Sequence, residues 1–457
     1  MTGEARRPPD PALAQRKRAV EAEIFARRPE HAVEPTLDRI SALATLLGDP
    51  QRACPVIHVT GTNGKTSTAR MMETLLRARG LRTGLFTSPH LSDIRERIVI
   101  DGEPLPLDAF LATYDEVAPY VALVDEREPV RLSFFEVLTA MAFAAFADAP
   151  VDVAVIEVGL GGTWDATNIA DGAVAVVTPV SIDHTRYLGF TIEEIAAEKA
   201  GIIKPGAVAI LGQQPLAAAE VLLRRAAEVE ATVAREGLEF GVVARELAVG
   251  GQVITVRGLA GEYPDLLLPL FGDYQAQNAA CALAAVEAFA SGGPGGEPLG
   301  EDLVREAFAT MTSPGRLEVV RRSPVVIADS AHNPAGMAAS VAAVTEAFSF
   351  RTLIAVLAIS EDKDVPAVLD QLEPAADELV ATRNSSDRSM DPGKLAEIAV
   401  GVFGPDRVRV ADRLDDAIDV AVGLADEAAT DGLGGSGVLV TGSVVTAGDA
   451  RSLLGRS

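Results

Sequence analysis

The stretch 55-PVIHVTGTNGKTSTARMMETLLRARG-80 decides the fold, because it places a glycine-rich turn between a strand and a helix. Residues 55–61 form an apolar, β-branched run that ends in a glycine, as buried strands often do. From Thr66 onward the apolar residues recur with helical spacing, and Gly80 is a suitable helix stop. The stretch therefore predicts a strand, a turn and a helix in succession.

The turn has the chemistry of a phosphate-binding loop. A phosphate needs unobstructed backbone N–H groups, the N-terminus of a helix and a lysine charge. The residues that can supply these are Gly61, Gly64, Lys65 and the hydroxyls of Thr66 and Ser67. The strict P-loop pattern would place a further glycine at Val59, so an ordinary glycine-rich turn is the alternative.

Strand-like and helix-like segments alternate along the rest of the chain, which indicates parallel α/β sheets. In the first half, strands are predicted at 81–88, 151–160 and 173–181, with a helix at 134–147. A glycine- and proline-rich stretch (291–300) and a hinge-like segment, 312-TSPGR-316, precede a second such series. There, strands are predicted at 324–330, 352–360, 378–383 and 437–443, with a helix at 335–348. We therefore predict a flexible leader over residues 1–20 and two α/β domains, 21–311 and 312–457, with a cleft between them.

Composition excludes several classes of protein. The 457 residues carry 40 Lys and Arg against 65 Asp and Glu, a net charge of 40 − 65 = −25, which disfavours nucleic acid and anionic membranes. The chain has no apolar run of the roughly 20 residues that a membrane span needs and no secretory signal at its start. Two distant cysteines make neither a disulfide framework nor a cysteine metal site. We expect a cytoplasmic protein.

Several polar residues follow predicted strands of the first half, where ligands of α/β sheets bind. Glu157 could hold Mg²⁺ beside a phosphate, or it could cap a turn. His184 would reach the same rim. Lys199, on a predicted helix at 193–206, has small apolar neighbours; on these grounds alone a snorkelling surface lysine is the favoured interpretation.

The second half contains a similar loop, 327-IADSAHNPAG-336. Asp329 and His332 are candidates there because loops at strand ends often carry function, although turn-forming residues would also explain the composition. Arg316 in the hinge could clamp a phosphate or be a solvated linker charge.

Taken together and in this order, these segments resemble folylpolyglutamate synthase and its bifunctional relative dihydrofolate synthase, of the Mur ligase superfamily. The matching segments are HVTGTNGKTS (58–67), TSPHLSDIRERI (87–98), SFFE (133–136), EVGLGGTWDATN (157–168), DHTRYLGFTIEEIAAEKAGIIK (183–204), PGRLE (314–318), DSAHNPAG (329–336) and TGS (441–443).

The resemblance implies an N-terminal P-loop ATPase domain, a smaller C-terminal Rossmann-like domain and an active site between them. It implies that the nucleotide contacts are Gly61, Thr62, Asn63, Gly64, Lys65, Thr66, Ser67, Asn278, Arg316, Asp329 and His332. It implies that Ser88, Glu157 and His184 are the Mg²⁺ ligands and that Lys199 is the lysine that relatives carbamylate, which reverses the surface interpretation. Lys65, Lys199, His332 and Asp329 are the expected catalytic residues. Whether Thr66 or Ser67 meets the metal stays open.

The implied reaction is ATP-dependent addition of L-glutamate to a folate, and also to dihydropteroate, through an acyl phosphate. ATP and one or two Mg²⁺ ions would take part, and a monovalent cation is an open option. A monomer without nucleic-acid or membrane partners is expected. The alternatives are a Mur-type ligase acting on a UDP-linked peptidoglycan precursor and a regulator that only holds ATP.

Overall fold

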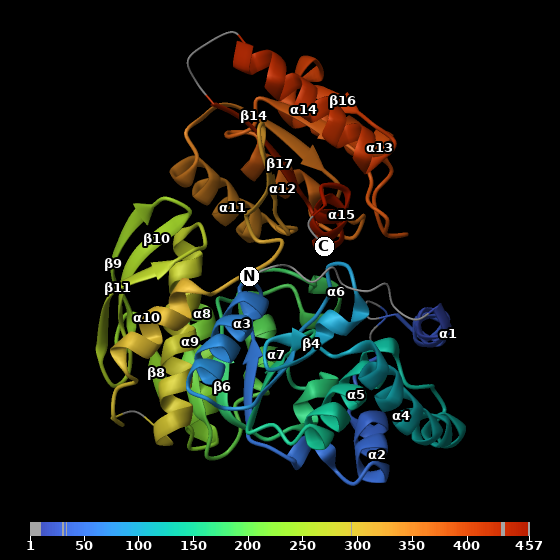
Figure 1. Cartoon of the computed structure of the whole chain (residues 1–457), viewed down its shortest axis with the longest axis vertical. Helices are drawn as coiled ribbons and strands as arrows, with labels where there is room; N and C mark the ends of the chain where they lie inside the picture. Colours follow the sequence, from blue (N-terminus) through green and yellow to red (C-terminus); the bar gives the residue numbers. More distant parts are fainter. Residues whose placement is uncertain (1–10, 30–31, 33, 294, 431–434, 456–457) are drawn as a thin grey trace.

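The chain folds into two lobes, each built from helices on a largely parallel sheet. The structure is a computed structural model that describes residues 11–29, 32, 34–293, 295–430 and 435–455. Figure 1 shows the second lobe, in orange and red, stacked on the first, which runs from blue to yellow. The predicted α/β class is confirmed.

The main sheet of the first lobe has eight strands in the described residues. In spatial order they are β4 (Glu103–Pro104), β3 (Ile98–Ile100), β2 (Thr83–Phe86), β5 (Val153–Glu157), β1 (Val56–Thr60), β6 (Gly172–Val177), β7 (Val208–Leu211) and β8 (Thr232–Arg235). Neighbouring strands pair in parallel along the series β2, β5, β1, β6, β7 and β8. At the other edge, β3 pairs antiparallel with both β2 and β4. The strands predicted at 55–61, 81–88, 151–160 and 173–181 are confirmed; the first three are shorter at both ends, and the fourth begins one residue earlier and ends sooner. Their carboxyl ends lie at the same edge of the sheet.

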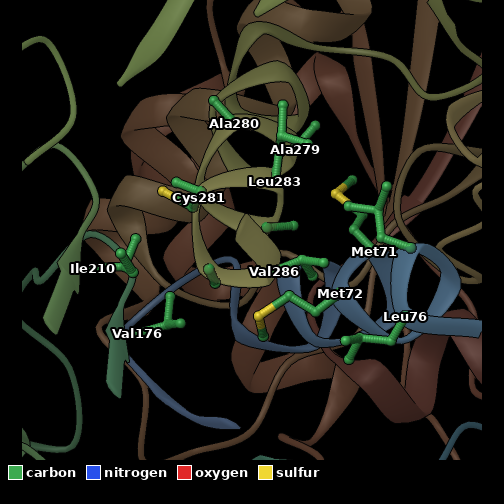
Figure 2. Close-up of a cluster of buried hydrophobic side chains, with 14 of the residues drawn as sticks. Met71, Met72, Leu76, Val176, Ile210, Ala279, Ala280, Cys281, Leu283 and Val286 are labelled. Atoms are coloured by element: carbon green, nitrogen blue, oxygen red, sulfur yellow. The ribbon is translucent and has the colours of Figure 1, made fainter. Parts of the chain in front are cut away.

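Helices cover both faces of this sheet. They are α1 (Pro11–Phe25), α2 (Asp38–Leu46), α3 (Lys65–Ala78), α4 (Leu107–Arg127), α5 (Phe134–Asp148), α6 (Thr185–Leu188), α7 (Ile192–Ala200), α8 (Leu216–Glu228), α9 (Asp273–Ser291) and α10 (Glu301–Ala309), with the short 3₁₀ turns η1 (Pro50–Arg52), η2 (Ile94–Arg97) and η3 (Ala166–Ile169). Figure 2 shows how α3 and α9 contribute Met71, Met72, Leu283 and Val286 to a buried cluster that also receives Val176 of β6. This packing fixes α3, and with it the turn that precedes α3.

Two predictions for the first lobe differ from the structure. Residues 11–20 of the predicted flexible leader begin α1, because Val20 and Ile24 are fully buried and Lys17 pairs with Asp93 at 2.9 Å; residues 1–10 lie outside the described residues. The helix predicted at 193–206 ends at Ala200, since glycine and proline occupy the following turn.

A second, antiparallel sheet of the first lobe was not predicted. Its order is β11 (Glu262–Leu268), β10 (Gly251–Arg257) and β9 (Gly241–Ala248). Arg245 of β9 forms an ion pair with Glu346 of the second lobe, and Phe271 lies 4.8 Å from Phe348 between ring centroids. These contacts join the two lobes on one side.

The second lobe contains the other parallel sheet. Its strands, in spatial order, are β12 (Glu318–Arg322), β13 (Val325–Ala328), β17 (Gly435–Thr441), β14 (Phe350–Leu357), β15 (Glu378–Ala381) and β16 (Val408–Val410). Its helices are α11 (Pro334–Ala347), α12 (Val365–Leu372), α13 (Pro392–Phe403), α14 (Leu414–Thr430) and α15 (Val444–Leu453), with the 3₁₀ turn η4 (Pro405–Arg407). Only β12 runs antiparallel to its neighbour among the described strands of this sheet. The strands predicted in this half correspond to β13, β14, β15 and β17, and the helix predicted at 335–348 to α11.

The connection between α10 and β12 joins the lobes, and the predicted domain boundary at 311–312 falls within it. By contrast, the glycine- and proline-rich stretch 291–300 only links α9 to α10 inside the first lobe. The exact domain limits stay a prediction.

Candidate active site

The turn between β1 and α3 has a backbone that only glycine allows at two positions. Gly61 has a φ of +148°, and a Cβ on it would lie 1.8 Å from Thr178 Oγ1. Gly64 has a φ of +87°, and a Cβ there would lie 2.5 Å from Asn278 Oδ1. Asn278, a predicted nucleotide contact, is therefore at the turn, where its Nδ2 donates to Gln275 Oε1 at 3.1 Å. Glycine at these two positions therefore lets Thr178 and Asn278 pack closely against the turn.

The middle of the turn is held by both lobes. The hydroxyl of Thr62 donates to the carbonyl oxygen of Ser181 at 3.0 Å. The amide of Asn63 and that of Asn333, from the second lobe, exchange hydrogen bonds of 3.3 and 3.1 Å. The turn thus meets the second lobe directly.

Lys65 is the first residue of α3, and its ammonium lies over the turn. Nζ donates to the carbonyl oxygens of Gly61 and Thr62, each at 3.1 Å. Burial lowers the pKa of Lys65, while the charges of Glu157 and Asp183 oppose that shift. An incoming phosphate would compete with neutral carbonyls for this ammonium, so the lysine is available to a strong anion.

The neighbouring hydroxyls of Thr66 and Ser67 lie on different faces of α3. Thr66 Oγ1 lies 2.8 and 3.0 Å from the two carboxylate oxygens of Glu157. Ser67 is buried, and its Oγ lies 2.8 Å from Ser313 Oγ in the connection between the lobes. Of the two hydroxyls left open by the sequence, the one beside the carboxylate is that of Thr66.

Glu157 is the last residue of β5 and is 1% exposed. It also accepts a hydrogen bond of 3.2 Å from the backbone nitrogen of Ser88, which follows β2. Burial raises the pKa of Glu157, and the charge of Lys65 opposes the shift. The described residues contain no cluster of three or more His, Cys, Asp or Glu that could hold a metal alone. A carboxylate with the Thr66 hydroxyl beside it fits Mg²⁺, which takes its other ligands from phosphate and water.

His184 and Asp183 follow β6, at the same edge of the sheet. His184 has a φ of +51°, and its Nε2 lies 4.0 Å from Asp183 Oδ2. Desolvation lowers the pKa of His184, although its side chain is 39% exposed, and this favours the neutral imidazole, which is the form that binds metals.

Asp183, which the sequence analysis missed, is the contact point for three residues of the second lobe. Its carboxylate accepts hydrogen bonds from Lys363 Nζ at 2.6 Å and Asn333 Nδ2 at 2.9 Å, and His332 Nε2 lies 3.5 Å away. Burial works to raise the pKa of Asp183, but the hydrogen bond with His332 and the charge of Lys363 outweigh it and hold the pKa well below its usual range. Asp183 follows β6 just as His184 does, and that position was the available signal.

The other predicted residues of the second half of the chain are Asp329, His332 and Arg316. Asp329 accepts hydrogen bonds of 3.0 Å from the backbone nitrogens of Leu317 and Ala331, so its carboxylate orders the connection between the lobes. The Nδ1 of His332 lies 2.9 Å from the carbonyl oxygen of Ser330, which leaves Nε2 toward Asp183. Arg316 Nη1 donates only to the neighbouring carbonyl of Gly315, at 3.3 Å.

Lys199 is buried. This agrees with the role that the family resemblance implied and contradicts the interpretation as a snorkelling surface lysine. Its Nζ donates to the carbonyl oxygen of Gly61 at 2.8 Å, and the residue is 3% exposed. Burial, followed by the charge of Lys65, lowers the pKa of Lys199 to about 7. A large share of this amine is neutral near pH 7.

A small pocket that is open to solvent lies beyond the carboxyl end of β5, where Gly159 and Leu160 of the following loop form part of its lining. Phe135 and Trp164 are the aromatic residues of its lining, and its charged residues are Arg28, Glu34, Arg39, Glu136 and Asp165. A Cβ on Gly159 would lie 2.6 Å from Phe135 Cζ, so a glycine is needed for the loop to pass this ring. The pocket and the phosphate-binding turn therefore share the loop that starts at Glu157.

This arrangement defines a two-lobed, ATP-dependent ligase of the Mur type. The Mur ligase middle domain matches residues 59–286, and the Mur ligase glutamate ligase domain matches residues 315–444. The chain belongs to the dihydrofolate synthase/folylpolyglutamate synthase family: it is 52% identical over 456 residues to the Mycobacterium tuberculosis dihydrofolate synthase/folylpolyglutamate synthase, covering 96% of this chain and 93% of that protein.

Solved structures agree with this assignment. The M. tuberculosis folylpolyglutamate synthase complexed with ADP and AMPPCP has a TM-score of 0.93 at 52% identity, covering 97% of this chain and 99% of that one. An Escherichia coli protein solved with DHPP and ADP has a TM-score of 0.81 at 31% identity, covering 99% of each chain. Separately, no helix among the described residues is long and apolar enough to cross a membrane.

Proposed function

We propose that this ligase adds L-glutamate to dihydropteroate and to reduced folates. The observation that carries the proposal is the shared loop after β5, which places an aromatic-walled pocket beside the phosphate-binding turn. Phe135 and Trp164 would offer ring surfaces for a flat pteridine to stack on, and the substrate carboxylate would then extend toward Glu157. We further propose that the protein acts as a monomer.

The reaction would proceed in two transfers. The substrate carboxylate attacks the γ-phosphorus of ATP, so that a C–O–P link forms and ADP leaves; the glutamate amine then attacks the acyl carbon and releases phosphate. Lys65 and the N-terminus of α3 would hold the transferring phosphoryl group, and Arg316 would approach it from the connection between the lobes. Closure of the two lobes would keep water from the acyl phosphate.

Mg²⁺ would be held by Thr66, Glu157 and Ser88, with His184 on the side of Asp183. When bound, it would neutralise charge on the β- and γ-phosphates. Asp329, whose oxygens both accept backbone N–H groups, would position the connection between the lobes instead of moving a proton.

The proposal is tested by ADP release, measured separately with dihydropteroate and with a reduced folate. We expect release only when an acceptor and L-glutamate are both present. Release with a UDP-linked peptidoglycan precursor but with neither pteridine would instead support the other Mur-type activity. Binding of ATP without any acceptor-dependent release would support a regulator.

The hydroxyl that meets the metal can be identified by substitution. Thr66→Val should lower turnover by about a hundredfold and raise the Mg²⁺ concentration that turnover needs, because a ligand beside Glu157 is lost. Ser67→Ala, the matched control, should mainly lower the free energy of unfolding, by about 1 kcal/mol, because it removes a buried hydrogen bond to Ser313. Equal Mg²⁺ requirements in the two variants would contradict the choice of Thr66.

The contact between Asp183 and Lys363 should hold the lobes together. Their side chains are only 7% and 10% exposed, so Asp183→Ala leaves a buried ammonium without a counter-charge and should lower the free energy of unfolding by about 3 kcal/mol. The double variant Asp183→Asn/Lys363→Met should recover part of that loss. Urea unfolding gives these energies, and small-angle X-ray scattering should show a larger radius of gyration for Asp183→Ala alone. Additive effects of the two substitutions would argue against the contact.

A further inference from the structure

Arg70 is a cation at the site to which neither the sequence motifs nor the proposed function gives a task. It lies on α3 four residues after Thr66, and residues at that spacing share one face of a helix. The charges of Glu96, Glu157 and Arg316 influence its pKa most. Arg70 therefore lies where α3, the loop after β2 and the connection between the lobes meet.

The guanidinium of Arg70 makes no hydrogen bond or ion pair with any residue that the structure describes, although burial lowers the pKa of Arg70. Two other arginines of the first lobe show the contrast: Arg39 donates to both oxygens of Glu136, and Arg77, on the same helix, donates to Glu73 at 3.1 Å. An arginine keeps its charge in a protein, and a confined charge without an acceptor is unfavourable. The free guanidinium thus suits an anion brought by a ligand.

The position of Arg70 along α3 indicates which anion it could bind. Lys65 and the N–H groups at the start of α3 are at the phosphate-binding turn, whereas Arg70 is a full helical turn farther from it. On that side lies the loop after β2, where Leu91 contacts Gly315 and Gly448 of the second lobe. An anion at Arg70 would therefore lie beside the phosphate-binding turn, toward the loop after β2 and the connection between the lobes.

We propose that Arg70 binds the carboxylate of the acceptor substrate, next to the terminal phosphate of ATP. This inference rests on the proposed function. The planar fork of a guanidinium can hold both oxygens of a carboxylate, and so it fixes the plane from which one oxygen approaches phosphorus. Arg70 is then a specificity-determining residue: it selects an acceptor that ends in an acid over one that ends in an amide.

The test compares dihydropteroate with its carboxamide, which keeps the pteridine and removes the charge. Dissociation constants are measured by calorimetry on the full chain with a non-hydrolysable ATP analogue present. The wild-type protein should bind the acid more tightly than the amide. Arg70→Met should weaken binding of the acid by about tenfold or more and leave the amide unchanged, and Arg70→Lys should fall between. The matched control Arg77→Met, an exposed arginine of the same helix, should behave as wild type.

The outcomes distinguish a failure of the inference about Arg70 from a failure of the proposed function. A loss of ATP-analogue affinity in Arg70→Met, with acid and amide still distinguished, would assign Arg70 to the phosphate and overturn the inference. Equal loss of both acceptors with a lowered melting temperature would mean a structural role and would also overturn it. A wild-type protein that binds neither dihydropteroate nor the amide would refute the proposed function itself.

Discussion

Lys65→Ala is expected to lower ligation by about a thousandfold, because it removes the ammonium that the carbonyl oxygens of Gly61 and Thr62 hold over the phosphate-binding turn. Phosphoryl transfer depends on positioning and charge neutralisation, and the remaining backbone N–H groups carry only partial charges. The fold should survive, since burial already disfavours the charged form of this lysine. The measurement is ADP release with saturating acceptor and glutamate, together with the thermal unfolding midpoint.

A matched control for Lys65 is Lys394→Ala. Lys394 lies on α13, where it pairs with Glu361 at 3.3 Å with both side chains exposed, so turnover should stay within twofold of wild type. If Lys65→Ala turned over at a rate near wild type, the turn between β1 and α3 would not be the ATP site.

The fold was largely predictable because the two large sheets consist mainly of buried parallel strands. Such strands are nearly continuous apolar runs, as in β1 and β5, whose residues are all buried, and they are easily located in a sequence. The antiparallel sheet of β9, β10 and β11 was not predicted. Its exposed edge strand β9 alternates poorly, and the hairpin signal at Gly250, with a φ of +83°, was the cue that could have revealed it.

The candidate site was predictable as a set of loops but not as a set of contacts. Glycines and acids at strand ends can be read from the sequence, whereas the rotation of α3 decides which of two adjacent hydroxyls faces Glu157. Asp183 escaped notice because its partners, Lys363 and Asn333, are 180 and 150 residues away in the other lobe. Contacts between lobes leave no local pattern.

The burial of Lys199 affects whether its amine can be carbamylated. Carbamylation needs a neutral amine that attacks CO₂, and it turns a cation into an anion. Because the pKa of Lys199 is lowered from 10.5 to about 7, the neutral amine increases as the pH rises through 7. Stability also increases with pH. Between pH 7 and 10.5 the unfolded chain binds a proton at Lys199 that the folded chain does not bind. For the unmodified lysine, the free energy of unfolding therefore rises with pH in this range.

Lys199→Ala is therefore expected to lose at least about a hundredfold of the ligase activity, and short carboxylates such as formate or acetate should restore part of it. The substitution opens space beside Gly61 and Gly162, whose backbones contact this residue, and a small carboxylate can enter it. Lys199→Met fills that space and should not be rescued, which makes it the matched control. In the wild-type protein, removal of CO₂ should lower activity, and added bicarbonate should restore it more fully at pH 8 than at pH 6. A ¹³C carbamate signal from labelled bicarbonate should disappear in both variants. Full activity in Lys199→Met would exclude a carbamate from the mechanism, since that side chain fills the site without any charge.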